Sequence, residues 1–115
     1  PMTAPTPSTD VTEIDDTTFN DAIQGAEFAV VDFFASWCGP CHMFAPVFKA
    51  LSKKYPQVVF LKLDGEKSPD ARATVKIPGL PFFAFYRNGE YIDGVATSKQ
   101  DRLQAKLDEH FGGDA

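Results

Sequence analysis

The chain has 115 residues, a length typical of one small domain. Its hydrophobic residues make up 43% of the sequence and include 11 phenylalanines, which is enough to build a buried core. The formal net charge of −5 argues against nucleic acid as a partner, because nucleic-acid-binding domains carry basic surfaces. No apolar run approaches the roughly 18 residues of a membrane span. The composition therefore predicts a soluble domain that binds neither nucleic acid nor membrane.

Residues 1–10 contain three prolines and four serine or threonine residues, which predicts a disordered lead-in. We interpret Pro1 as a residue left by cleavage of a tag and Met2 as the native start. The residues that follow lack the features of a secretory signal and of a transit peptide, so we expect a cytoplasmic protein. The folded domain is expected over 11–111, with a frayed end at 112–115.

Strands and helices are expected to alternate along the first half of the domain. A short strand over 11–14 precedes a helix with N-cap candidates at 15–17 and an end at Gly25. Residues 28–35 (FAVVDFFA) are nearly all apolar, which predicts a central strand buried on both faces. Apolar residues recur at helical spacing over 41–55, a helix that its internal proline, Pro46, should kink.

The second half continues with a strand over 58–63. Ser68-Pro69-Asp70 has the N-cap, first-turn proline and acid of a short helix, which must end near Lys76 because a proline follows two residues later. Asn88-Gly89 predicts a hairpin between two strands, and Ser98–Asp101 is a capping box that opens the last helix. This order predicts an α/β domain with a mixed five-stranded sheet and helices on both faces.

The chain has two cysteines, Cys38 and Cys41, in the pentapeptide WCGPC between the buried strand and the next helix. A cysteine at a helix N-terminus meets unpaired backbone N–H groups and the positive end of the helix dipole, which favour its thiolate. A second cysteine three positions later lies one turn away and can attack a mixed disulfide formed by the first. We therefore assign Cys38 as the nucleophile and Cys41 as the resolving thiol.

Asp32 is a lone carboxylate inside the apolar run VVDFF. If the strand is central, burial raises the pKa of this carboxyl group and makes it a proton carrier near neutral pH. The alternative is an exposed position on the strand.

Several segments of the chain resemble the thioredoxin family, in order from about Val11 to Phe111. VDFFASWCGPCHMFAP is similar to the family's active-site strand, loop and helix, IPGLP to the loop whose last proline is cis (here Pro81), and FYRNGE to the terminal hairpin. The resemblance implies a thioredoxin fold and a monomeric protein-disulfide reductase with a redox-active Cys38–Cys41 disulfide. It also implies recycling by an NADPH-dependent thioredoxin reductase, with no cofactor or metal bound by this chain.

The resemblance also implies roles for other residues. Asp32 is identified as the buried acid that assists deprotonation of the resolving cysteine, and Lys62 as the lysine that pairs near it. Substrate is expected to contact the residues around Cys38 and the proline loop, namely Trp37, Gly39, Pro40, Leu80 and Pro81.

Two positions depart from the family pattern. His42 stands where the family commonly has lysine, and we expect it to make the surface beside the disulfide pH-responsive. Phe82 stands where threonine is usual. Since side chains alternate along a strand, we expect Phe82 to point away from the cysteines into the core. The alternative is a bulky lip on the substrate groove.

Other functions were weighed against this one. Cys38 to His42 also match the attachment pattern of c-type haem, although the strand-to-helix element leaves little room for a porphyrin. A structural zinc site needs four ligands, and the remaining candidate, His110, is expected on the last helix. Two alternatives within the same fold are a subunit that binds a partner protein, with an incidental redox pair, and an oxidant or isomerase.

Overall fold

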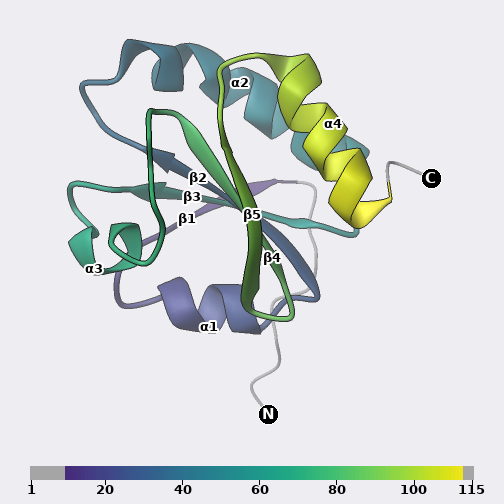
Figure 1. The fold of residues 1–115 in the computed structure, drawn as a ribbon, viewed down its shortest axis with the longest axis horizontal. Coiled ribbons are helices and arrows are strands. Elements are labelled where there is room, and N and C mark those ends of the chain that lie inside the picture. Colours follow the sequence, from purple (N-terminus) through teal and green to yellow (C-terminus); the bar gives the residue numbers. More distant parts are fainter. Residues whose placement is uncertain (1–9, 113–115) are drawn as a thin grey trace.

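The computed structural model describes residues 10–112 and has one five-stranded sheet between two helical layers (Figure 1). The sheet order is β1-β3-β2-β4-β5; β1 and β2 run parallel to β3, whereas β4 runs antiparallel to β2 and β5. The strands are β1 (Val11–Ile14), β2 (Phe28–Phe34), β3 (Val59–Asp64), β4 (Phe82–Arg87) and β5 (Glu90–Ala96). The predicted mixed sheet is confirmed. The expectations for the rest of the lead-in and for residues 113–115 fall outside the described part.

Four helices cover the sheet: α1 (Phe19–Gln24), α2 (Gly39–Lys54), α3 (Pro69–Arg72) and α4 (Gln100–Phe111). α2 and α4 pack on one face, and α1 and α3 lie on the other (Figure 1). Within residues 10–112, no helix is long and apolar enough to cross a membrane.

β2 is the middle strand, and its side chains supply both halves of the core. Val30 belongs to the apolar cluster beneath α2 and α4, whereas Val31 and Phe33 belong to the cluster beneath α1. This division follows from the alternation of side chains along a strand. Because both faces are covered, β2 tolerates polar side chains poorly, and Asp32 in its middle is the exception.

The boundaries of two helices differ from the expectation. α2 begins at Gly39, two residues earlier than predicted, because Cys38 is its N-cap and Pro40 fits the first turn, where no N–H partner is needed. The helix continues across Pro46. α3 ends at Arg72 instead of near Lys76.

The predicted helix caps are confirmed only in part. The candidates at 15–17 are wrong, since Thr18 is the N-cap of α1. Ser68 is the N-cap residue of α3, as predicted, but its side chain makes no cap hydrogen bond, and its buried hydroxyl has no partner among the described residues. The carboxylate of Asp16 takes its place and accepts hydrogen bonds from the backbone N–H groups of Asp70 and Ala71, at 3.1 and 2.7 Å. The capping box at Ser98 does not form either, since Lys99 is the N-cap of α4 and makes no side-chain cap.

The Asn88-Gly89 hairpin is confirmed. Both residues have positive φ, 51° and 82°, as a type I′ turn between β4 and β5 requires. The Asn88 N–H also donates to the carbonyl oxygen of Glu27 at 2.8 Å, which ties the hairpin to the start of β2.

Phe82 lies in the core, as predicted. Its side chain is 3% exposed and belongs to the cluster beneath α1, on the face opposite α2. Its ring centroid lies 6.3 Å from that of Phe33, and a Cβ atom at Gly94 would clash with the ring. The neighbouring strand thus has glycine where the Phe82 ring needs the space.

Replacing Phe82 with threonine should therefore destabilise the fold. Truncation of a buried phenylalanine costs about 3–5 kcal/mol, and each kcal/mol lowers the melting temperature of such a domain by roughly 4–8 °C. We expect Phe82→Thr to melt at least about 10 °C below wild type by circular dichroism. Met43→Ala, which removes an exposed apolar side chain, is the control. Equal, small shifts in both variants would contradict a core role for Phe82.

Candidate active site

Cys38 and Cys41 are joined by a disulfide at the N-terminus of α2. Their Cα atoms lie 5.3 Å apart, and each residue is only 4% exposed. Cys38 is the N-cap residue, and its Sγ accepts a hydrogen bond from the backbone N–H of Cys41 at 3.2 Å. The same N–H group would stabilise a thiolate on Cys38 after reduction, and the helix dipole acts in the same direction.

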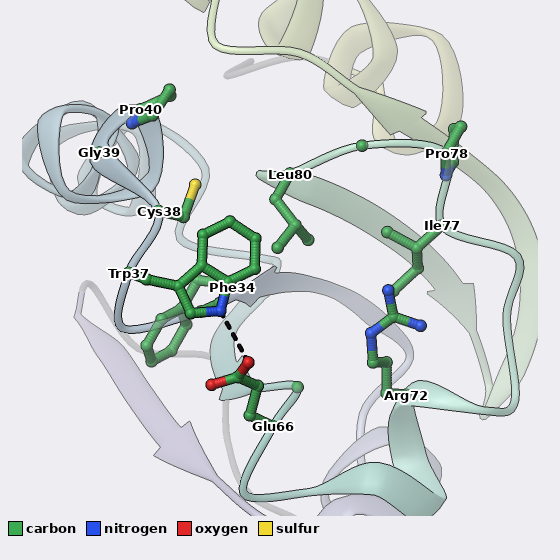
Figure 2. A pocket seen from close by; sticks show the side chains of 13 residues that line it. Phe34, Trp37, Cys38, Gly39, Pro40, Glu66, Arg72, Ile77, Pro78 and Leu80 are labelled. Atoms are coloured by element: carbon green, nitrogen blue, oxygen red, sulfur yellow. Dashed lines mark hydrogen bonds between the residues drawn. The ribbon is translucent and has the colours of Figure 1, made fainter.

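A groove of about 600 Å³ opens beside Cys38 (Figure 2). Its lining includes four of the predicted substrate-contact residues, Trp37, Gly39, Pro40 and Leu80. A Cβ atom at Gly39 would meet nothing within 4 Å, so the surface in front of this residue is open. The groove is largely apolar, and an extended substrate segment could lie in it next to the disulfide.

Pro81 is the predicted contact that does not line the groove. The Leu80–Pro81 peptide bond is cis, as the resemblance implied. Pro81 itself is buried, and its carbonyl oxygen accepts a hydrogen bond from the Thr97 N–H at 3.2 Å. Leu80 packs against the small cluster of Ala35, Cys38 and Cys41 and so brings the proline loop to the disulfide.

Trp37 is 68% exposed, yet its indole is fixed in place. The Nε1–H group donates to Oε2 of Glu66 at 2.7 Å (Figure 2). Glu66 follows β3, 29 residues away along the chain. This bond holds the exposed ring as one wall of the groove.

His42 is oriented toward the loop that precedes the disulfide. Its Nε2 lies 2.7 Å from the carbonyl oxygen of Ser36. Since a carbonyl oxygen accepts, Nε2 must carry the proton, and His42 ties the first turn of α2 to the loop between β2 and α2. The expected pH response of this surface stays a prediction.

Asp32 is buried, so the alternative of an exposed position is wrong. The residue is 5% exposed, and its Oδ1 has no hydrogen-bond partner among residues 10–112. Burial raises the pKa of Asp32 from its ordinary 3.8 to about 7, against a smaller opposing effect of the positive charge on Lys62. Lys62 is the direct neighbour of Asp32 in the β2–β3 register.

A second pocket of about 340 Å³ leads to this carboxyl group from the α2 side. Asp32 and Lys62 line it together with Ala45 and Pro46 of α2. Ala45 lies one helical turn beyond Cys41, so the pocket reaches the part of α2 next to the resolving cysteine. The arrangement gives the buried acid a route for proton exchange with solvent.

The sequence did not indicate three residues that line the groove: Gly65, Glu66 and Arg72. They follow β3 and come close to the WCGPC segment because β2 and β3 are neighbours in the sheet. No local motif marks them. His110 lies on α4, as predicted, and among the described residues it forms a group of three potential metal ligands with Asp93 and Glu109.

The fold and site define a single α/β domain with a redox-active cysteine pair at the start of a helix. Comparison with known proteins agrees: the sequence model of the thioredoxin family matches residues 10–109. Thioredoxin H1 of Arabidopsis thaliana is 40% identical over 98 residues, which cover 82% of this chain and 86% of the relative.

Solved structures give the same assignment. Thioredoxin f from spinach chloroplast (long form) superposes with a TM-score of 0.84 at 28% identity, covering 90% of this chain and 88% of the other. A chain in the complex of ferredoxin:thioredoxin reductase with thioredoxin f2 also gives 0.84, at 31% identity and 90% and 96% coverage. The chain belongs to the thioredoxin family and is a thiol–disulfide oxidoreductase.

The raised pKa of Asp32 predicts how stability depends on pH. Below about pH 4 the carboxyl group is protonated in both the folded and unfolded states. As pH rises toward 7 the unfolded chain loses the proton first, so folding becomes less favourable, by about 4 kcal/mol above pH 7. Asp32→Asn should therefore raise the free energy of unfolding at pH 8.5 and have little effect at pH 4.

Urea denaturation of the oxidised protein at the two pH values measures this difference. Asp21→Asn, the same chemical change at an exposed position on α1, controls for net charge. A gain of equal size at pH 4 and pH 8.5 would mean that Asp32 is not a buried acid with a raised pKa.

Proposed function

We propose that this protein reduces disulfides of other proteins and is itself oxidised to the Cys38–Cys41 disulfide. The observation that carries the proposal is the position of this disulfide, at a helix N-terminus and beside an open, largely apolar groove. The groove can receive an extended segment, and the helix N-terminus favours the attacking thiolate.

The exchange runs in two steps. The thiolate of Cys38 attacks one sulfur of the substrate disulfide; a mixed disulfide forms, and the other substrate sulfur leaves as a thiolate and takes up a proton. Cys41 then loses its proton and attacks Sγ of Cys38. The mixed disulfide breaks, the second substrate thiol is released, and two electrons and two protons have passed from this protein to the substrate.

Asp32 would accept the proton of Cys41 in the second step. A group with a pKa of about 7 is present in both protonation states near neutral pH, as a general base requires. The pocket beneath Ala45 and Pro46 supports this role, since it connects the carboxyl group with solvent. Lys62, beside Asp32, would limit the rise of the pKa and so keep part of the carboxyl group ionised.

Recycling requires a reductase, and we propose an NADPH-dependent thioredoxin reductase. The complex of ferredoxin:thioredoxin reductase with thioredoxin f2 shows that a related chain of the same fold binds a reductase, which supports a partner of this general kind. The chain is similar both to an H-type thioredoxin and to a thioredoxin f from chloroplast, so its own compartment needs a direct test by localisation in cells. We propose a monomer in the cytoplasm, with no cofactor of its own.

Insulin reduction tests the function. With NADPH and a thioredoxin reductase, the protein should consume NADPH in proportion to added insulin; ferredoxin:thioredoxin reductase, with photoreduced ferredoxin, is the parallel arm for recycling. Protein reduced chemically beforehand should reduce insulin without either enzyme. If prereduced protein fails to do so, it is not a disulfide reductase, and the oxidant and partner-binding alternatives gain support.

The roles of the two cysteines lead to a prediction for single variants. Cys41→Ser should accumulate a mixed disulfide with a substrate peptide through Cys38, because no resolving thiol remains. Cys38→Ser should lose reduction and form little adduct, because its remaining thiol, on Cys41, lies within the first turn of α2 and does not line the groove. Intact-protein mass spectrometry measures both. Adduct formation of equal extent in Cys38→Ser would contradict the assignment.

A further inference from the structure

One cation faces the groove beside the disulfide. Arg72 is the last residue of α3, and its guanidinium group lies on the side of the groove near Ile77 (Figure 2). A Cβ atom at Gly65 would lie 3.0 Å from Cδ of Arg72, closer than ordinary packing allows. The glycine thus leaves room for the aliphatic part of the arginine side chain at the groove.

The Arg72 guanidinium has no ion pair or side-chain hydrogen bond to any of residues 10–112. The acid in the same groove is already engaged, since Glu66 accepts the hydrogen bond of the Trp37 indole. The groove therefore holds one negative and one positive charge, but only the carboxylate already accepts a side-chain hydrogen bond, whereas the N–H donors of the Arg72 guanidinium are open to a ligand.

The surroundings of Arg72 make it suited to bind a carboxylate. Arg72 is exposed, and Ile77 is the apolar side chain beside its guanidinium group (Figure 2). Phe34 and Leu80 also line the groove, and apolar walls reduce the screening of a charge pair by water. A guanidinium group presents paired N–H donors that match the two oxygens of a carboxylate, and such charge-assisted bonds are stronger than neutral ones.

We propose that Arg72 is a specificity-determining residue that binds an aspartate or glutamate side chain next to the substrate's disulfide cysteine. The inference rests on the proposed function, because the substrate must lie in the groove for its cysteine to meet Cys38. In this arrangement the apolar part of the substrate segment contacts Leu80 and Trp37, while the acidic side chain reaches Arg72. The protein then prefers disulfides in acidic segments, despite its own net charge of −5.

The test uses three disulfide-linked peptides that differ only at the two residues flanking the cysteine, which are glutamate, glutamine or lysine. The measured quantity is the second-order rate constant with which chemically prereduced protein reduces each peptide in a single turnover. An exposed ion pair is worth roughly a two- to fivefold change in rate. Wild type should therefore prefer glutamate over glutamine by about this factor, and glutamine over lysine.

Variants at Arg72 separate a specific contact from a general charge effect. Arg72→Gln should remove the preference, Arg72→Glu should reverse it, and Arg72→Lys should retain part of it. Lys54→Glu is the matched control, since it changes the net charge as Arg72→Glu does but lies at the far end of α2, about 24 Å along the helix from Cys38. This control should keep the wild-type order of peptides. High salt should weaken the preference.

The outcomes distinguish this inference from the function on which it rests. Equal rates for the three peptides in wild type, or the same loss of preference in Lys54→Glu as in Arg72→Glu, would overturn the role of Arg72 and leave the reductase function standing. Failure of wild type to reduce even the glutamine peptide would overturn the proposed function.

Discussion

The site depends on the direct junction between β2 and α2. β2 is the middle strand and is fixed on both sides by β3 and β4, so its end at Phe34 is held in one place. Five positions later the chain is already helical, and the residue between loop and helix is Cys38. Its sulfur therefore lies where the backbone N–H groups of the first turn have no partner within the helix. The electrostatic environment that suits a thiolate is a consequence of where the helix begins.

A second constraint is that the same central strand carries Asp32. Burial of a carboxyl group without a full set of hydrogen bonds destabilises the folded state at neutral pH, and no packing requirement of the sheet explains its presence. Proton exchange between Asp32 and Cys41 at the pocket beneath α2 would explain why a destabilising carboxyl group is present in the central strand. Stability and proposed function then make opposite demands on one residue, as is common where pKa values are strongly shifted.

The fold and the cysteine pair could be predicted because their signals are local. The apolar run around Asp32, the WCGPC motif and the Asn88-Gly89 turn each specify a structure within a few residues. The helix caps could not be predicted in the same way, since Asp16 caps α3 from a position 54 residues before Asp70. The far wall of the groove also depends on contacts between distant parts of the chain. Glu66 and Arg72 come close to Cys38 because β2 pairs with β3, and no local sequence motif indicates this proximity.

The reduction potential of the Cys38–Cys41 pair is the most direct test of the claim that this protein acts as a reductant. Among the described residues, a single hydrogen bond, from the Cys41 N–H, reaches Sγ of Cys38. Stabilisation of the thiolate is thus limited, and a limited stabilisation of the reduced form keeps the pair reducing. Because the chain belongs to the thioredoxin family, equilibration with glutathione buffers should give a potential of about −270 mV, the value typical of thioredoxins. A value of about −180 mV or higher, in the range of isomerases and oxidants, would contradict the account.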